Sequence, residues 1–359
     1  MCFIRNNRNK HMKSFSRKLL EWYNPTNRNL PWKKTNDAYK IWLSEIILQQ
    51  TRVEQGTPYY LAFVKQYPTV KRLANAPLDD VLKLWEGLGY YSRARNLHFA
   101  SKQIMQLHNG KFPETHAEII QLKGIGTYTA AAISSFAYNL PHAVLDGNVY
   151  RVLSRVFGIE TPIDSTIGKS TFQKLADDLL DKRNPSVYNQ AIMDFGAIMC
   201  KPQNPLCENC PFSSECKALQ LDKINLLPIK SKKLIKTERH FHYFVLYDSK
   251  NIYISQRTEN DIWNGLFEFP VEEVNGQWSI DNSDFIKKID PQSSIINQPL
   301  SYKQTLSHQY INGYFHEISV GKLPKLDKSY LKIKKSDILN YAFPKIIRSY
   351  LENRLIFIS

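Results

Sequence analysis

The chain has 359 residues and a net charge of +15. This length exceeds the roughly 100–200 residues of a single domain, so we expect two domains. Hydrophobic residues make up 43% and charged residues 23%, which excludes wholesale disorder. The sequence has no run of about 18 apolar residues and no secretory signal at its start, so we expect a soluble intracellular protein without a membrane partner.

The basic charge is unevenly distributed. Residues 1–110 carry 18 lysines and arginines against 7 acidic residues, residues 111–220 carry 10 against 11, and residues 221–359 carry 20 against 15. This excess favours a polyanionic partner, and nucleic acid before a membrane surface, because no basic amphipathic anchor stands out. A generally basic proteome would produce the same balance, so charge alone leaves the partner open.

The first two thirds of the chain have a helical pattern. Apolar stripes at helical spacing run through residues 15–23, 39–47 and 94–107, with Pro- and Gly-containing breaks between them. Further helices are predicted at about 148–157, 165–180 and 186–200. Met12 is an alternative start to Met1, in which case residues 1–11 form a basic arm.

One predicted helix carries an isolated acidic residue. The stretch Trp42-Leu-Ser-Glu-Ile-Ile-Leu-Gln-Gln-Thr-Arg52 contains Glu45 on a mostly apolar face. An exposed Glu on an amphipathic helix is one interpretation. If apolar neighbours surround the carboxyl instead, burial raises its pKa and lets it act as an acid near neutral pH.

Two glycines mark a turn between helices. Gly124 and Gly126 lie in Leu122–Ala130, before an Ala-rich helix predicted over Thr129–Phe136. They allow a tight turn with bare N–H groups, and the helix N-terminus adds positive potential. Such a turn can hold a DNA phosphate without reading sequence. An ordinary corner between helices would have the same sequence, and Asp146, further on, could simply cap the helix predicted from about Asn148.

Four of the five cysteines lie close together, at Cys200, Cys207, Cys210 and Cys216. Clustering in an intracellular chain indicates metal or cluster ligation rather than disulfides. Only one short Cys-x-x-Cys is present, whereas structural zinc more often uses two. Four thiolates suit an iron–sulfur cluster, with zinc as the alternative. Cys2 stands alone and is assigned no role.

The amino-acid composition and the predicted secondary structure change after the cysteines. Residues 223–238 are Lys-rich and contain Pro228, which predicts a linker. Residues 240–247 and 251–256 are rich in β-formers and are joined by Asp248–Asn251, which predicts a β-hairpin. Another strand at 310–320 and a closing helix at 342–355 complete an α+β domain over residues 239–359.

Several motifs together resemble one protein family. The glycine turn and Asp146 are similar to those of the helix–hairpin–helix DNA glycosylases. Within that superfamily, Trp42–Arg52, Leu84–Asn96 and Leu30-Pro-Trp32 resemble the A/G-specific, MutY-like adenine DNA glycosylases. The resemblance implies a mostly α helix–hairpin–helix glycosylase domain over 12–222 with an iron–sulfur loop at 200–216, and a Nudix-like lesion-recognition domain over 239–359.

The implied function is base-excision repair of double-stranded DNA. A monofunctional enzyme would hydrolyse the N-glycosidic bond of adenine opposite 8-oxoguanine or guanine. Glu45 would protonate the adenine, Asp146 would stabilise the cationic sugar, and Asn148 would orient the water or Asp146. The resemblance also implies a base pocket that includes Trp32 and Asp194.

The resemblance assigns DNA contact to residues of both predicted domains, and Gln50 and Tyr90 are the candidates for wedging the duplex. Core packing against Tyr91 is the alternative for Tyr90. The residues assigned to DNA contact are Gln49, Gln50, Leu88, Tyr90, Lys123, Gly124, Gly126, Ser307 and His308.

Tyr128 separates this sequence from its endonuclease III-like relatives. Those relatives carry a Lys at this position of the hairpin, and its amine attacks the sugar. A phenol cannot form a Schiff base, so we expect base removal without strand cleavage. Two alternatives stay open: an endonuclease III-like glycosylase and AP lyase for oxidised pyrimidines, and a non-enzymatic DNA-binding protein on the same scaffold.

The second domain also carries the resemblance. Gln256-Arg257 and Trp263–Pro270 are similar to the C-terminal domain of the MutY-like enzymes, which is itself similar to Nudix hydrolases. The Glu-rich Nudix box is absent, so pyrophosphatase activity is not expected. Thr305-Leu-Ser-His308 matches the loop that contacts 8-oxoguanine, with Leu306 in place of the usual Phe. A plain strand turn is the alternative.

The cofactor and cellular setting follow from the same family. It carries a 4Fe–4S cluster at this cysteine spacing, which implies that Cys200, Cys207, Cys210 and Cys216 hold one here. We expect a monomer in the bacterial-type cytoplasm that associates with the nucleoid when bound to DNA.

Overall fold

The computed structural model describes residues 14–231, 235–274, 278–289, 294–295 and 298–354. Met1, Cys2, Met12 and the predicted basic arm lie outside the described residues. The backbone contacts divide the chain into two compact units. The first unit contains residues 1–74 and 99–233, and the second contains residues 75–98 and 234–359. The boundary at residue 98 falls inside helix α6 (Ser92–Leu107).

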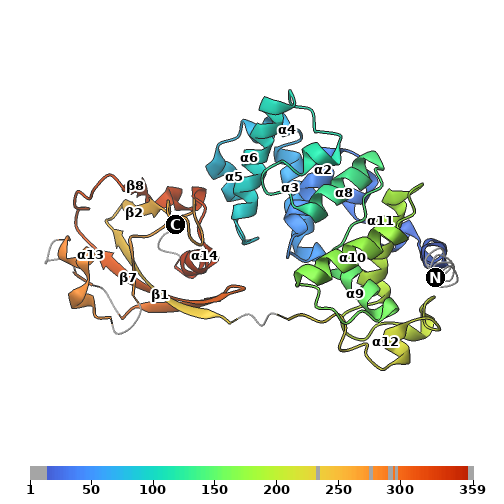
Figure 1. Ribbon diagram of the computed structural model, residues 1–359. Helices are drawn as coiled ribbons and strands as arrows, with labels where there is room; N and C mark the ends of the chain where they lie inside the picture. Colours follow the sequence, from blue (N-terminus) through green and yellow to red (C-terminus); the bar gives the residue numbers. More distant parts are fainter. Residues whose placement is uncertain (1–13, 232–234, 275–277, 290–293, 296–297, 355–359) are drawn as a thin grey trace. The chain divides into compact units, whose positions relative to one another are not determined.

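The first unit is helical, as the apolar periodicity predicts (Figure 1). A helix at residues 14–22 leads into it. The helices that follow in this unit are α2 (Ala38–Leu48), α3 (Val53–Gln66), α4 (Val70–Ala74), the second half of α6, α7 (His116–Ile119), α8 (Thr127–Tyr138), α9 (Gly147–Phe157), α10 (Thr166–Leu179), α11 (Pro185–Asp194) and α12 (Lys217–Gln220).

A shared apolar core holds helices α8–α11 and the cysteine loop together. Phe15 and Leu19 of the N-terminal helix pack here with Val152, Phe195 and Phe212. The Phe15 and Phe212 rings stack with their centroids 4.6 Å apart. The cysteine loop is therefore anchored to the helical core through Phe212, and each buried aromatic ring contributes on the order of 1.5–3 kcal/mol to stability.

The last predicted helix of this unit differs from the expectation. We expected a helix over 186–200, but α11 ends at Asp194 and a π-helical turn follows over Phe195–Met199. The wider turn brings the Gly196 carbonyl within 2.6 Å of an Arg151 Nη2 donor. It also seats Gly196 against Asn148, where a Cβ on residue 196 would lie only 2.7 Å from the Cβ of Asn148. Close approach to Asn148 thus explains the glycine at position 196.

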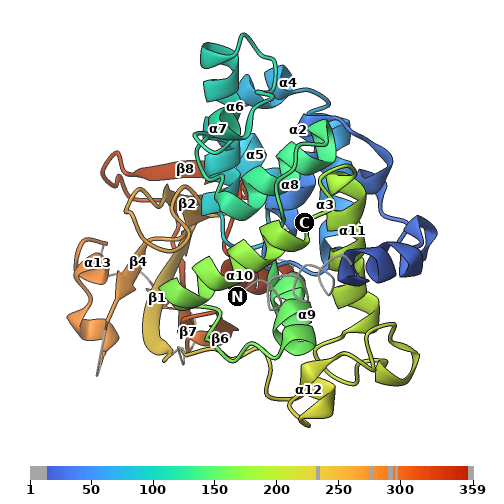
Figure 2. The same ribbon diagram turned by 45° about the vertical axis from the view of Figure 1, so that its right-hand side comes forward.

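The second unit contains a mixed sheet with helices beside it. Among the described residues the sheet has eight strands, and the long strands β1 and β7 lie parallel and side by side (Figures 1 and 2). The predicted hairpin is confirmed, with Tyr247 of β1 opposite Ile252 of β2. The strands are β1 (Thr237–Tyr247), β2 (Asn251–Gln256), β3 (Phe267–Glu268), β4 (Val271–Glu273), β5 (Ser294–Ile295), β6 (Leu300–Thr305), β7 (Gln309–Ser319) and β8 (Tyr330–Lys334).

Among the described residues, the α-helices that lie wholly in this unit are α5 (Leu78–Leu84), α13 (Asp284–Lys287) and α14 (Lys345–Glu352). Stacking of Tyr350 on Phe315 of β7, at a centroid distance of 4.2 Å, packs α14 on the sheet. Segment 75–98 joins the unit through polar contacts. Lys83 donates to the Tyr341 carbonyl at 2.9 Å, and the Phe343 amide donates to Glu86 at 2.9 Å.

Within the parts of the chain that the structure describes, we find no helix with the length and apolar character that crossing a membrane requires.

Candidate active site

The first unit contains a cavity of about 620 Å³. Side chains from α2, α8, α9 and α11 reach it, together with residues 23–35. Of the residues predicted for catalysis or base binding, the cavity brings together Trp32, Glu45, Tyr128, Asp146, Asn148 and Asp194. These residues are up to about 160 positions apart in the sequence, and they come together only in the folded unit.

Glu45 is buried, with 8% of its surface exposed. Helix α2 is apolar around it, and the exposed-Glu interpretation is therefore wrong. The Tyr128 hydroxyl donates a hydrogen bond to Glu45 Oε2 at 2.7 Å. Burial raises the pKa of Glu45 to about 7, and the nearby Asp146 charge adds to the rise, while the Tyr128 hydrogen bond opposes it. Glu45 can therefore carry a transferable proton at neutral pH.

Asp146 both caps a helix and faces the cavity. It occupies the N-cap of α9, where its Oδ1 accepts from the Val149 amide at 2.8 Å. Its Oδ2 accepts from Asn148 Nδ2 at 2.8 Å. Burial raises the pKa of Asp146, and these two hydrogen bonds oppose that rise. Capping and a functional role are therefore compatible, because the cap leaves the carboxylate on the cavity wall.

Arg151 is a part of the site that the sequence did not reveal. Its Nη2 donates to Asn148 Oδ1 at 2.8 Å, and its Nε donates to the Cys200 carbonyl at 2.8 Å. Asn148 is thus held between Arg151 and Asp146, which fixes the orientation of its amide. The only available sequence signal was the spacing of Arg151, three residues after Asn148 on one helix face.

A second charged group lines the same cavity. Asp194 is 1% exposed and accepts from Arg28 Nη1 at 2.9 Å and from Lys33 Nζ at 2.5 Å. Burial lowers the pKa of Lys33, while its pairing with Asp194 opposes this. Trp32 is buried and packs edge-on against Tyr60. Sequence reasoning missed Arg28 and Lys33 as site residues, because nothing local pairs them with a side chain some 160 positions away.

The glycine turn has the predicted form. Gly124 has φ +79°, the left-handed conformation that glycine adopts without strain. Gly126 is the N-cap of α8, and a Cβ placed there would meet no atom within 4 Å. Lys123 is exposed beside the turn. The hairpin therefore presents open backbone next to a basic side chain.

The predicted wedge residues lie at the surface in unusual backbone conformations. Gln50 has φ +56° and Tyr90 has φ +46°. Tyr90 is 40% exposed, so the core-packing alternative is wrong for it. Gln49 is partly buried, and its amide donates to Thr129 Oγ1 at 3.3 Å.

The second unit has a cavity of its own, of about 410 Å³. Leu88 and Tyr90 line it on one side, and Ser307 and His308 line it on another. Ser307 and His308 form the turn between β6 and β7, so the plain strand turn is an accurate local description. The Tyr90 hydroxyl and Ser307 Oγ share a hydrogen bond. Leu88 is buried behind them, with 7% exposed.

None of the four clustered cysteines is in a disulfide, and Cys200 and Cys216 lie beside Arg155. Arg155 is 2% exposed; its Nη1 lies 3.6 Å from Cys200 Sγ, and its carbonyl lies 3.4 Å from Cys216 Sγ. Burial raises the pKa of each thiol. Among the described residues, no three His, Cys, Asp or Glu side chains already converge as metal ligands would. The donor set still fits a soft, thiolate-bound group: four sulfurs in one loop, with a buried cation beside them.

Comparisons with known proteins bear on this arrangement. Residues 43–176 match the family model of the HhH-GPD superfamily of base excision DNA repair proteins, and residues 242–353 match the NUDIX domain. An adenine DNA glycosylase of Buchnera aphidicola subsp. Baizongia pistaciae is 39% identical over 305 residues, which cover 83% of this chain and 84% of that protein.

The chain belongs to the adenine DNA glycosylase family.

Other relatives agree with this assignment. The adenine DNA glycosylase of Buchnera aphidicola subsp. Schizaphis graminum is 34% identical across 94% of this chain and 98% of that protein. The human adenine DNA glycosylase is 42% identical over 217 residues, 58% of this chain and 40% of its own length. The predicted fold class, a helical helix–hairpin–helix part followed by a Nudix-like part, is confirmed, and so is the assignment to DNA base-excision repair glycosylases.

Solved structures are similar to 60% of this adenine DNA glycosylase family member. A thermostable thymine-DNA glycosylase matches 60% of the chain and 99% of its own, with a TM-score of 0.56 and 29% identity. An endonuclease III–DNA covalent intermediate matches 60% of the chain and 98% of its own, with a TM-score of 0.53. At 20% identity, the second likeness shows the fold alone.

Proposed function

We propose that the protein removes adenine from double-stranded DNA where it is paired with 8-oxoguanine or guanine, and that it leaves the strand uncut. The observation that carries this proposal is the cavity that Glu45, hydrogen-bonded to Tyr128, and Asp146 both line. An acid and a carboxylate in one cavity are the two groups that cleavage of a bond between a base and a sugar requires.

Glu45 is the general acid in this proposal. The adenine must leave the base stack to reach the cavity, at a cost of a few kcal/mol that is smaller at a mismatch. With a pKa of about 7, Glu45 is substantially protonated at neutral pH and can donate its proton to N7 of the base. Protonation turns adenine into a neutral leaving group.

Asp146 acts on the sugar. As the glycosidic bond breaks, the sugar becomes cationic, and an ionised carboxylate stabilises that charge or bonds to it transiently. The Val149 amide and Asn148 hold both oxygens of Asp146. Asn148 is itself oriented by Arg151, so Asp146 is held in place before the reaction.

Tyr128 distinguishes this reaction from that of a glycosylase with lyase activity. A phenol has no amine with which to attack the sugar, and burial together with the Glu45 charge raises the pKa of Tyr128 well above its usual value. Tyr128 instead donates its proton to a hydrogen bond with Glu45 and orients the acid. An endonuclease III-like glycosylase and lyase is the alternative that this residue disfavours.

The second unit supplies recognition of 8-oxoguanine in this proposal. The 410 Å³ cavity exposes Ser307, His308 and Tyr90 on its walls. 8-Oxoguanine differs from guanine by one oxygen and one N–H group. A hydrogen bond made only with the lesion is worth about 1–3 kcal/mol, which is enough to discriminate the two bases.

We also propose a 4Fe–4S cluster bound by Cys200, Cys207, Cys210 and Cys216. The support is the four-thiol donor set next to Arg155, together with membership of a family in which such clusters are typical. When bound, the cluster would order the surrounding loop for DNA contact. The hydrolysis is performed by Glu45 and Asp146, and no step of it passes through the cysteines.

The remaining proposals concern the setting. Duplex DNA as the substrate requires access to the chromosome, so we propose a monomer that acts in the bacterial-type cytoplasm, at the nucleoid.

One assay tests the central proposal. A labelled duplex with adenine opposite 8-oxoguanine is incubated with the protein, and half of each sample is then heated in alkali.

Cleavage of the adenine strand only after alkali is the expected result, since an abasic site remains intact until base is added. Cleavage without alkali at oxidised pyrimidines would favour the endonuclease III-like alternative. Binding without base release would favour a non-enzymatic DNA-binding protein.

A further inference from the structure

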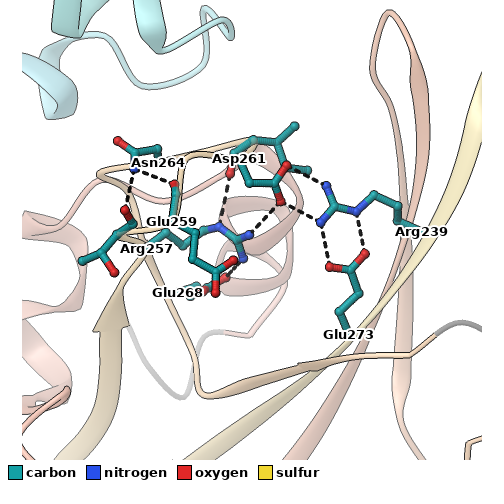
Figure 3. A network of polar contacts seen from close by, with 9 residues as sticks. Arg239, Arg257, Glu259, Asp261, Asn264, Glu268 and Glu273 are labelled. Carbon is teal, nitrogen blue, oxygen red and sulfur yellow. Dashed lines mark hydrogen bonds and ion pairs between the residues drawn. The ribbon is translucent and has the colours of Figure 1, made fainter.

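The second unit contains a network of charged side chains (Figure 3), and one of its members, Asp261, lines the 410 Å³ cavity. The centre of the network is Asp261, in the loop between β2 and β3. Two arginines converge on this carboxylate, Arg239 from β1 and Arg257 from the end of β2. Each arginine also holds a second carboxylate, Glu273 for Arg239 and Glu268 for Arg257.

The contact between Arg239 and Asp261 is bidentate. Arg239 Nη1 donates to Asp261 Oδ1 at 3.0 Å, and Nη2 donates to Oδ2 at 2.6 Å. The Arg239 hydrogen bonds lower the pKa of Asp261, so the carboxylate stays ionised. Two parallel hydrogen bonds fix the position and the orientation of the aspartate.

Arg257 fixes the backbone beyond Asp261. Its side chain is 7% exposed, and its Nε donates to the Ile262 carbonyl at 3.2 Å, while its Nη2 lies 3.3 Å from Asp261 Oδ2. Its remaining nitrogen pairs with the buried Glu268 at 2.7 Å. The guanidinium therefore ties the loop to strand β3.

The loop held in this way forms part of the cavity wall. Asp261, Ile262 and Trp263 line the cavity together with Ser307 and His308. Trp263 has φ +61°, a conformation that a bulky residue keeps only when its surroundings enforce it. The two arginines hold the loop at Asp261, two residues before Trp263, and the Trp263 ring itself packs against Phe241.

We propose that Asp261 is a positioning residue for lesion discrimination: clamped between Arg239 and Arg257, it sets the Ile262–Trp263 wall at the distance from Ser307 and His308 that admits 8-oxoguanine. This inference rests on the proposed reading of 8-oxoguanine by the second unit. Asp261 acts through the loop that follows it and donates no group to the reaction.

The test uses the full chain and single-turnover excision of adenine from two duplexes, one with 8-oxoguanine and one with guanine opposite the adenine. The quantity compared is the ratio of the two rate constants. Asp261→Asn should lower this ratio by about 5- to 10-fold, because a small displacement of a positioned wall weakens recognition. Glu273→Gln is the matched control: it also removes a carboxylate from Arg239, but Glu273 does not line the cavity, and its ratio should stay within 2-fold of the parent.

The outcomes separate this inference from the function on which it rests. A parent chain without preference for 8-oxoguanine would refute both. A parent with that preference and an Asp261→Asn variant that keeps it would overturn only the role of Asp261, as would equal losses in Asp261→Asn and Glu273→Gln. If Asp261→Asn does not fold, as judged by its thermal unfolding, Arg239→Lys tests the same contact, because it keeps the charge but loses the bidentate fork. An unchanged ratio in Arg239→Lys would likewise overturn the proposal.

Discussion

The protonation state of Glu45 controls the proposed reaction. Glu45 must be protonated to act, and its pKa is about 7, so the single-turnover excision rate should fall as pH rises through about 7, approaching tenfold per pH unit above it. Asp146 must be ionised, so the rate should also fall at acid pH. A pH series of single-turnover rates on one duplex checks both limbs.

Two variants test whether deprotonation of Glu45 causes the fall of the excision rate at alkaline pH, the alkaline limb of the pH profile. Tyr128→Phe removes a hydrogen bond that lowers the pKa of Glu45, so that limb should move to higher pH. Glu45→Gln should lose about 100-fold or more in rate at every pH, since an amide cannot donate the proton. An alkaline limb that stays in place in Tyr128→Phe would assign it to another group.

A substitution of Asp146 should affect catalysis and leave stability almost unchanged. Asp146→Asn should reduce excision by about 100- to 1000-fold, because the charge is needed as the sugar becomes cationic. Asparagine caps a helix about as well as aspartate, so the thermal unfolding midpoint should change little. Excision within a few-fold of the parent, measured with saturating protein, would remove Asp146 from the mechanism.

At the scale of elements, the π turn after α11 supports the site because its Gly196 packs against Asn148. Gly196→Ala would place a Cβ 2.7 Å from that of Asn148, and Asn148 hydrogen-bonds Asp146. Displacing Asn148 should lower the excision rate by about 10-fold or more, with a smaller loss of DNA affinity. Single-turnover rates and equilibrium DNA binding on the same preparation separate the two effects, and a loss confined to binding would contradict the prediction.

Strands β1 and β7 carry a buried histidine pair. His242 Nδ1 and His316 Nε2 lie 3.1 Å apart, and the His242 ring stacks on Trp278. Burial lowers the pKa of each to about 4, whereas an unfolded histidine titrates near 6.5. Between these values the unfolded chain binds more protons, so stability is present above about pH 6.5 and is lost as pH falls toward 4.

The thermal unfolding midpoint should therefore drop more between pH 7 and pH 5 in the parent than in a variant with His242→Phe and His316→Phe. Scanning calorimetry of both proteins over this pH range makes the comparison, and parallel pH curves would show that the pair does not contribute.

The helix and strand boundaries show which features of the structure could be predicted from the sequence. Apolar periodicity and turn residues predicted α8, α9 and the β1–β2 hairpin closely, because those signals are local. The contacts of Asp194 with Arg28 and Lys33 could not be predicted, since no local pattern pairs side chains so far apart. The same holds for the two arginines at Asp261, since Arg239 lies in β1 and Arg257 directly follows β2. Periodicity shows which face of an element is buried, but it does not show what lies against that face.

At the scale of the whole molecule, the cysteine loop (residues 200–216) follows the helices in the sequence and packs on their core through Phe212. Cys207→Ser should reduce the yield of folded protein, its iron and sulfide content and its affinity for DNA more than it reduces the excision rate of the bound complex, because Glu45 and Asp146 lie on other elements. Metal and sulfide analysis of anaerobically purified protein provides the check. Zinc without iron in the parent would refute the proposed cluster.

Segment 75–98 and the C-terminal part of the chain form one compact unit, and the cavity in that unit takes walls from both. Residues 234–359 therefore do not form a separate domain that could be exchanged without segment 75–98. A chimaera that imports residues 234–359 from a relative would set a foreign Ser-His turn against the resident Gly87–Arg95 wall. A shortened chain ending near residue 222 would leave Lys83 and Glu86 without their contacts to Tyr341 and Phe343. A change in the proposed lesion preference would therefore involve two stretches of the chain, residues 87–95 and 304–308, that are about 200 positions apart.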